Sequence, residues 1–172
     1  PADGPSQVLL SRAGLVGLCG ANEAGVAVLV NTLSQLPVTD NGVLVAGALR
    51  AAMATETVVA AAQALTSLPH ASGQAYTLVE QGAARGLECG AAGSVEYLND
   101  PDRPDARWHT NHPLVAKADE SDEDGDGVSS PARLTALDER VRDITDLDGL
   151  KTLLADGDSG ICMYPGRWPD GS

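Results

Sequence analysis

The chain has 172 residues, of which 43% are hydrophobic and only 3% aromatic, with no phenylalanine. This length suits one domain with a sizeable core, and the apolar content excludes a disordered chain, so small side chains should fill the core. The net charge of -13 repels phosphate backbones and anionic headgroups, which excludes a nucleic-acid or membrane-surface role.

The sequence contains no recognisable targeting signal or membrane-spanning segment. No uncharged apolar stretch approaches the roughly 20 residues that span a bilayer, and residues 1–4 lack the basic start and apolar run of a signal peptide. The three cysteines, Cys19, Cys89 and Cys162, are odd in number and form no CxxC pair, which suits buried, reduced thiols. The expected compartment is therefore the cytoplasm of a bacterial-type cell.

Residues 14–33 contain two short apolar runs separated by the turn residues Asn22-Glu23-Ala24-Gly25. This pattern predicts a β-hairpin that ends at Asn31. The Ala-rich stretches 43–53 and 56–68 follow, with apolar residues at helical spacing, and Pro69 closes the second. They predict two helices, the second capped by Thr55.

Short segments broken by glycines predict a meander of strands at 74–79, 86–89 and 94–98, and a further strand is expected over 108–111. The acidic segment 118–130 predicts a solvated loop. Its DEDGDG run copies the opening of a calcium loop, but Arg133 stands where that loop needs a bidentate Glu.

Two more helices are expected near the end of the chain. Pro131 suits the first turn of a helix that reaches about Val141, with Ser129 or Ser130 as its cap, and a short helix should cover 147–154. An apolar strand is expected around Ile161. Strands and helices that are grouped in this way predict an α+β fold in a single partial domain, 1–172, whose two ends look unfinished.

The string Trp108-His109-Thr110-Asn111-His112-Pro113 places polar side chains together where a predicted strand ends. They could form an oxyanion donor with its supports, or a metal site. On a strand His109 and His112 would point to opposite faces, which disfavours a shared metal. Local turn hydrogen bonds are the simpler alternative.

The order of these features resembles the penicillin acyltransferase family, a branch of the N-terminal-nucleophile hydrolases that is related to penicillin V acylases and bile salt hydrolases. The matching features are the GxNEAGVAVxVN hairpin, Arg50, Glu88, the HTNHP string and the SSPAR segment. The resemblance runs from about Gly17 to about Leu154.

The resemblance implies an αββα sandwich in four layers, incomplete in this chain. It also implies cleavage of a small-molecule amide or thioester by an N-terminal Cys, exposed by self-cleavage, whose free amine serves as the base. No cofactor and no metal are implied. A companion chain that carries the nucleophile and a homo-oligomer are both compatible with it.

By position, Asn31 and Asn111 match the asparagines of the family's oxyanion hole, and Arg133 matches an arginine near the nucleophile. Neutral donors stabilise the negative charge of a tetrahedral intermediate without titrating, and a guanidinium favours a thiolate. The simpler alternatives are a strand end, a turn and a solvated helix residue, respectively. Four residues are supporting candidates: Asn22, Glu88, His109 and His112.

The family's nucleophile is missing, because the sequence starts with Pro1 and none of its cysteines stands at a chain start. Upstream strands on another chain, a gene fragment and a non-catalytic relative are the three explanations. The chain alone should be inactive. A non-catalytic binding or structural module is the rival function, and convergence of Asn31, Asn111 and Arg133 on one cavity would discriminate between the two.

Overall fold

The computed structural model describes residues 4–118 and 129–162. The chain divides into two compact units, Pro1–Gly125 and Asp126–Ser172, and each is described by itself. A single partial domain over 1–172 therefore stays a prediction. The DEDGDG run and most of the acidic segment lie outside the described residues.

The first unit is a six-stranded sheet with two helices inserted between its third and fourth strands. The strands are β1 (Gln7–Leu10), β2 (Cys19–Asn22), β3 (Ala27–Thr32), β4 (Gln74–Glu80), β5 (Ala83–Gly90) and β6 (Gly93–Tyr97). The helices are α1 (Val45–Met53) and α2 (Val58–Thr66). This confirms the predicted hairpin, the helix pair and the meander, and adds β1, which the sequence analysis did not predict.

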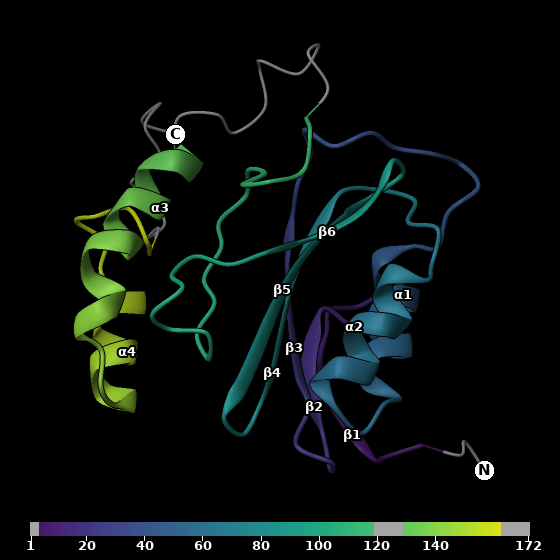
Figure 1. Ribbon diagram of the computed structural model, residues 1–172, viewed down its shortest axis with the longest axis horizontal. Helices are drawn as coiled ribbons and strands as arrows, with labels where there is room; N and C mark the ends of the chain where they lie inside the picture. Colours follow the sequence, from purple (N-terminus) through teal and green to yellow (C-terminus); the bar gives the residue numbers. More distant parts are fainter. Residues whose placement is uncertain (1–3, 119–128, 163–172) are drawn as a thin grey trace. The chain divides into compact units, whose positions relative to one another are not determined.

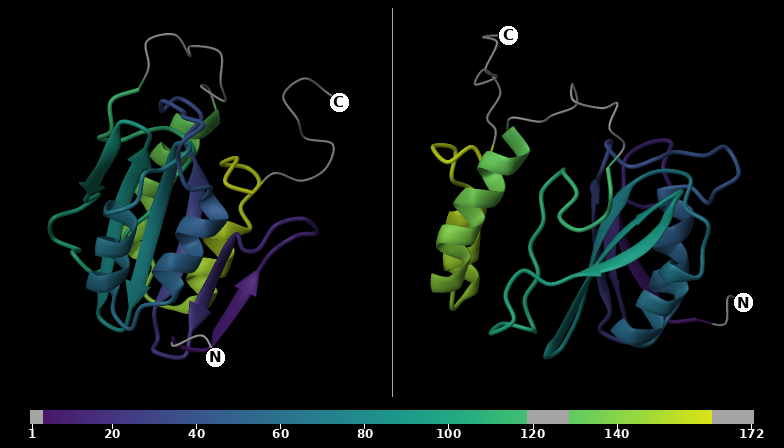
Figure 2. Two further views of the ribbon diagram at one scale, coloured as in Figure 1. Left: turned by 90° about the vertical axis from the view of Figure 1, so that its right-hand side faces the viewer. Right: turned by 45° about the horizontal axis from the view of Figure 1, so that its top comes forward.

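All neighbouring strands are antiparallel, and they lie in the sheet in their sequence order. Helices α1 and α2 cover one face of this sheet, whereas the segment that follows β6 runs along the opposite face (Figures 1 and 2). The α+β class is thus confirmed, with one β layer and one helical layer of the expected sandwich present in this unit. Across the described residues, no helix is long and apolar enough to cross a membrane.

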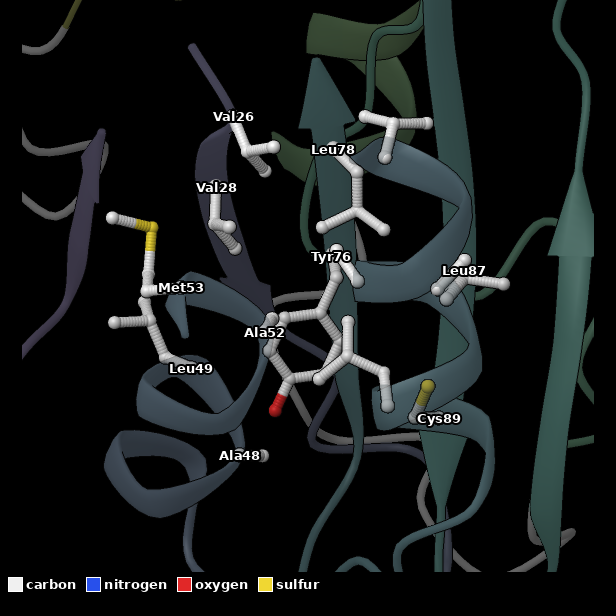
Figure 3. Close-up of a cluster of buried hydrophobic side chains, with 14 residues drawn as sticks. Val26, Val28, Ala48, Leu49, Ala52, Met53, Tyr76, Leu78, Leu87 and Cys89 are labelled. Carbon is white, nitrogen blue, oxygen red and sulfur yellow. The ribbon is translucent and has the colours of Figure 1, made fainter. Parts of the chain in front are cut away.

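The core lies between the sheet and the two helices (Figure 3). Successive turns of α1 contribute Ala48, Leu49, Ala52 and Met53, all fully buried, because this spacing places them on one side of the helix. The sheet contributes alternate strand residues, including Val28, Tyr76, Leu78, Leu87 and Cys89. A core with many alanines and valines agrees with the composition.

The cap of α2 is two residues later than predicted. The Thr57 side chain accepts a hydrogen bond from the Ala60 N–H, whereas the Thr55 hydroxyl donates to the Ala52 carbonyl at the end of α1. A cap must stand directly before the first helical residue, which here is Val58.

The strand predicted over 108–111 is wrong, because these residues form an irregular segment. The Asn99 side chain makes the two backbone hydrogen bonds that a neighbouring strand would otherwise make with Trp108. It accepts from the Trp108 N–H at 3.1 Å and donates to the Trp108 carbonyl at 2.9 Å. The backbone N–H and C=O of Trp108 are satisfied in this way without a ladder.

The second unit contains the two predicted helices, α3 (Ser129–Arg140) and α4 (Leu147–Leu154). A 3₁₀ turn (Val141–Asp143), which was not predicted, lies between them. Ser129 and Ser130 lie inside the first turn of α3 and not before it. Asp146 caps α4 by accepting from the Gly149 N–H at 2.7 Å. The strand predicted around Ile161 is not seen at 161–162, where the chain bends, and the residues beyond lie outside the described part.

Candidate active site

A row of cross-strand partners places Asn31 and Glu88 on the same face of the sheet. Asn31 pairs with Ala75, Ala75 with Glu88, and Glu88 with Val95. Side chains alternate along a strand, and the flanking Val30 packs into the helix-covered core, so this row points to the face opposite α1 and α2. It is the face along which residues 98–118 run (Figures 1 and 2).

Asn111 meets the end of β3. Its side-chain amide donates to the backbone carbonyl of Thr32 at 3.2 Å, and Thr32 directly follows Asn31. Two of the residues that the sequence predicted for an oxyanion site, 80 positions apart, are thus brought to the same end of one strand. An irregular segment crosses the sheet face to place the second of them there.

Glu88 is a fully buried carboxylate that accepts four hydrogen bonds. Oε1 accepts from His109 Nε2 at 2.8 Å and from the Leu114 N–H at 2.5 Å, and Oε2 accepts from the N–H groups of Val115 and Ala116 at 3.0 and 2.6 Å. Burial alone raises the pKa of this carboxyl, but the bonds from His109 and the three backbone N–H groups outweigh it and hold the pKa below its usual value. Glu88 is therefore ionised at neutral pH, and it does not face solvent.

The His109 ring is fixed on three sides. Besides Glu88, its Nδ1 lies 2.6 Å from the Thr110 carbonyl oxygen, and its ring packs edge-on against Tyr97 at 4.9 Å between centroids. The Tyr97 ring lies across Gly86, where an added Cβ would come within 2.3 Å of it, and its hydroxyl reaches Thr77 Oγ1 at 3.0 Å. A side chain at position 86 would displace this support.

His112 and Asn22 have other surroundings. His112 Nδ1 lies 3.2 Å from the Thr110 hydroxyl, within the loop. Asn22 lies at the β2–β3 turn, at the opposite end of β3 from Asn31, and its side chain donates to the Met53 and Thr55 carbonyls at 2.9 and 2.7 Å. The structure therefore does not bring Asn22 to the site.

Arg133 lies half-buried on α3, in the second unit, so its convergence with Asn31 and Asn111 stays a prediction. Of the cysteines, Cys89 is fully buried in the core, and that burial raises the pKa of its thiol to about 11. A thiol in such surroundings is a poor nucleophile. Cys19 and Cys162 are half-buried and reduced.

A pocket of about 280 Å³ opens at this end of the sheet. Its walls are largely apolar and include Leu36, Pro37, Gly90, Val95 and Ala116, with Lys117 and Ser94 as polar members. Ala116 also donates its N–H to Glu88, so the segment that Glu88 holds forms one wall of the pocket. The pocket could accept a small apolar group.

A family model described as acyl-coenzyme A:6-aminopenicillanic acid acyl-transferase matches residues 10–167, nearly the whole chain. The chain belongs to this family. The membership agrees with the resemblance carried by the hairpin and the HTNHP string. A comparison with curated proteins finds no match.

Among solved structures, the acyl-transferase family chain is similar to the Caenorhabditis elegans N-acylethanolamine-hydrolyzing acid amidase (NAAA) ortholog. The TM-score is 0.57 at 15% identity, over 91% of this chain and 75% of the other. At that identity the likeness concerns the fold alone. The predicted fold family is thereby confirmed.

From the sequence of this acyl-transferase family member, Glu88 is only a supporting candidate. Its three backbone donors at 114–116 become visible in the structure. One signal was present: Glu88 interrupts an otherwise apolar run between Leu87 and Cys89, and a carboxylate inside a buried strand needs partners.

Proposed function

We propose that this chain carries the oxyanion-stabilising part of an amide-bond hydrolase or acyltransferase that works through a cysteine acyl-enzyme. The observation that carries the proposal is the hydrogen bond from the Asn111 amide to the Thr32 carbonyl, directly beside Asn31. It brings two neutral carboxamides to one strand end, on the sheet face that α1 and α2 leave uncovered. Family membership and the fold support the reaction class.

In the proposed reaction a thiolate attacks the carbonyl carbon, and the carbonyl oxygen takes up negative charge. The N–H groups of Asn31 and Asn111 donate to that oxygen. Donors held in place before the reaction stabilise the charge without reorganisation, and the bond to the Thr32 carbonyl holds Asn111 in this way. The intermediate collapses to a thioester and releases the amine. Water or a second amine then takes the acyl group, which distinguishes hydrolysis from transfer.

We propose that the nucleophilic cysteine comes from a polypeptide segment other than these 172 residues. Cys89 is excluded as nucleophile by its complete burial and by the raised pKa of its thiol. Arg133 is proposed to steer the thiolate or the substrate, since a guanidinium stays charged at any working pH. The substrate is a small amide or thioester, no cofactor takes part, and reduced cysteines suit a cytoplasmic protein.

Trapping of the acyl-enzyme tests this proposal. The protein encoded by the complete gene is incubated with a panel of N-acyl amides and acyl thioesters, quenched, and examined by peptide mass spectrometry. The proposal predicts an acyl adduct on a cysteine outside these 172 residues. An adduct on Cys19, Cys89 or Cys162 would overturn the assignment of the nucleophile, and absence of any adduct or turnover would favour a non-catalytic binding module.

A further inference from the structure

Glu88 binds the segment 109–116 on both sides of Asn111. Two residues before Asn111, the His109 ring reaches Oε1, and three to five residues after it the N–H groups of 114–116 reach both carboxylate oxygens. Asn111 therefore sits on a short loop whose two ends are tied to one side chain. We propose that Glu88 is a positioning residue that holds Asn111 at the end of β3 through this clamp.

The loop belongs to no regular secondary structure. Residues 98–118 contain no helix or strand, so the N–H groups of Leu114, Val115 and Ala116 have no ladder to join. Glu88 stands in for that ladder from the neighbouring strand β5. The small Ala75, between Asn31 and Glu88 in the cross-strand row, leaves room for Ala116 to pack beside Leu33 and Leu36.

Only a carboxylate satisfies this set of donors. An ionised carboxylate offers about four lone-pair sites, and here each oxygen accepts two N–H groups. The isosteric amide of glutamine has a single acceptor oxygen, so its NH₂ group would face two backbone or ring donors. The clamp thus depends on the charge of Glu88 and not only on its shape.

The His109 ring is held at both of its nitrogens. Nε2 lies 2.8 Å from the Glu88 carboxylate and Nδ1 lies 2.6 Å from the Thr110 carbonyl oxygen, and the ring is buried. The orientation of His109, two residues before Asn111, is therefore fixed by Glu88 together with the backbone of the loop.

Hydrogen exchange on the unmodified protein tests the clamp without reference to activity. Val115 is half exposed and lies outside any strand, so its amide would exchange nearly as fast as in an unfolded chain unless Glu88 holds it. We expect the amides of 114–116 to exchange about 100-fold or more slowly than in an unfolded chain. Exchange within about threefold of the unfolded rate would overturn the clamp.

A matched pair of variants tests the effect on Asn111. In Glu88→Gln the side-chain amide resonances of Asn111 and the Nε2 proton of His109 should shift or broaden. The control is Glu80→Gln, which alters a half-buried carboxylate on β4 that accepts one backbone bond, from the Val58 N–H at 2.8 Å. Unchanged Asn111 resonances in Glu88→Gln, or equal changes in both variants, would contradict the positioning role.

The catalytic consequence rests on the proposed function and is measured separately, in the complete gene product. Loss of a positioning residue typically costs about 10- to 100-fold in activity, and here the loss should fall on kcat while KM changes less than about threefold. The Glu80 control should keep both parameters. If the protein has no activity, the proposed function fails while the exchange and resonance results still decide the clamp.

Discussion

The Asn111 side-chain amide donates a 3.2 Å hydrogen bond to the Thr32 backbone carbonyl, and so joins the loop on the sheet face to the end of β3. Asn111 follows β6, and β6 is joined to β3 only through β5 and β4. The bond therefore forms only when these four strands are paired. The proposed site is therefore a product of the folded sheet and not of a local motif. Changes that disturb the loop or its supports should act on both stability and function.

Acid should weaken the protein through Glu88. Burial raises the pKa of this carboxyl, but the hydrogen bonds from His109 and the backbone outweigh it, and the folded pKa lies below the ordinary value of 4.5. The stabilisation is thus complete above about pH 4.5 and is lost as the pH falls through the folded pKa. Urea unfolding from pH 7 to pH 3 should show the advantage of the wild type over Glu88→Gln shrinking in acid. An advantage that stays constant over this range would contradict the prediction.

Gly86→Ala should destabilise the first unit. The new methyl group would meet the Tyr97 ring at 2.3 Å, and that ring supports His109 at 4.9 Å. Overpacking of this kind costs about 1–3 kcal/mol of the free energy of unfolding. Gly47→Ala, on the exposed side of α1, is the control and should change stability by less than about 1 kcal/mol. Equal denaturation midpoints for the two variants would contradict the prediction, because the Tyr97 ring would then move aside at no measurable cost in stability.

Tyr76→Phe should be neutral or stabilising. The Tyr76 hydroxyl is buried in the helix-covered core and, within the described part of the chain, has no hydrogen-bond partner (Figure 3). Burying an unsatisfied hydroxyl costs about 1–3 kcal/mol, and phenylalanine avoids this cost without a change of shape. Differential scanning calorimetry measures the effect. A loss above about 1 kcal/mol would mean that the hydroxyl has a bound partner such as water.

Asn22→Ala should be strongly destabilising. The buried Asn22 side chain donates to the Met53 and Thr55 carbonyls and accepts from the Val26 N–H at 3.0 Å, so one residue joins the hairpin turn to the end of α1. Loss of three bonds that leaves buried partners unsatisfied should cost about 2–4 kcal/mol in urea unfolding. Asn41→Ala, at an exposed loop position, should stay within about 0.5 kcal/mol. Similar values for the two variants would contradict the structural role of Asn22.

Most of the fold could be predicted because the patterns are local. The Asn22–Gly25 turn is signalled by its residues, and Gly25 indeed adopts a positive φ of 90°. The Ala-rich spacing of α1 and α2 specifies two short helices that bury one side each. The edge strand β1 was not predicted. Its Val8 and Leu10 side chains are exposed, whereas Leu9 packs against the core, so the strand shows little of the pattern of a buried strand.

The site could be predicted only in part. Asn31 and Asn111 were found through the family resemblance, and the structure brings them to one strand end. The segment around His109 was wrongly predicted as a strand, because nothing local in its sequence shows that the Asn99 side chain bonds to the backbone of Trp108. Glu88 and its backbone donors lie 26 to 28 residues apart, and no local pattern encodes a contact of that length.

The central claim is that the Asn111 carboxamide stabilises an oxyanion, and the most direct measurement is kcat/KM of the complete gene product on its best amide or thioester substrate. Asn111→Ala should lower kcat/KM by about 100- to 1000-fold, mainly through kcat. Asn41→Ala should leave it unchanged, and both variants should unfold within a few degrees of the wild type. A folded Asn111→Ala protein that keeps kcat/KM within about threefold would contradict the account.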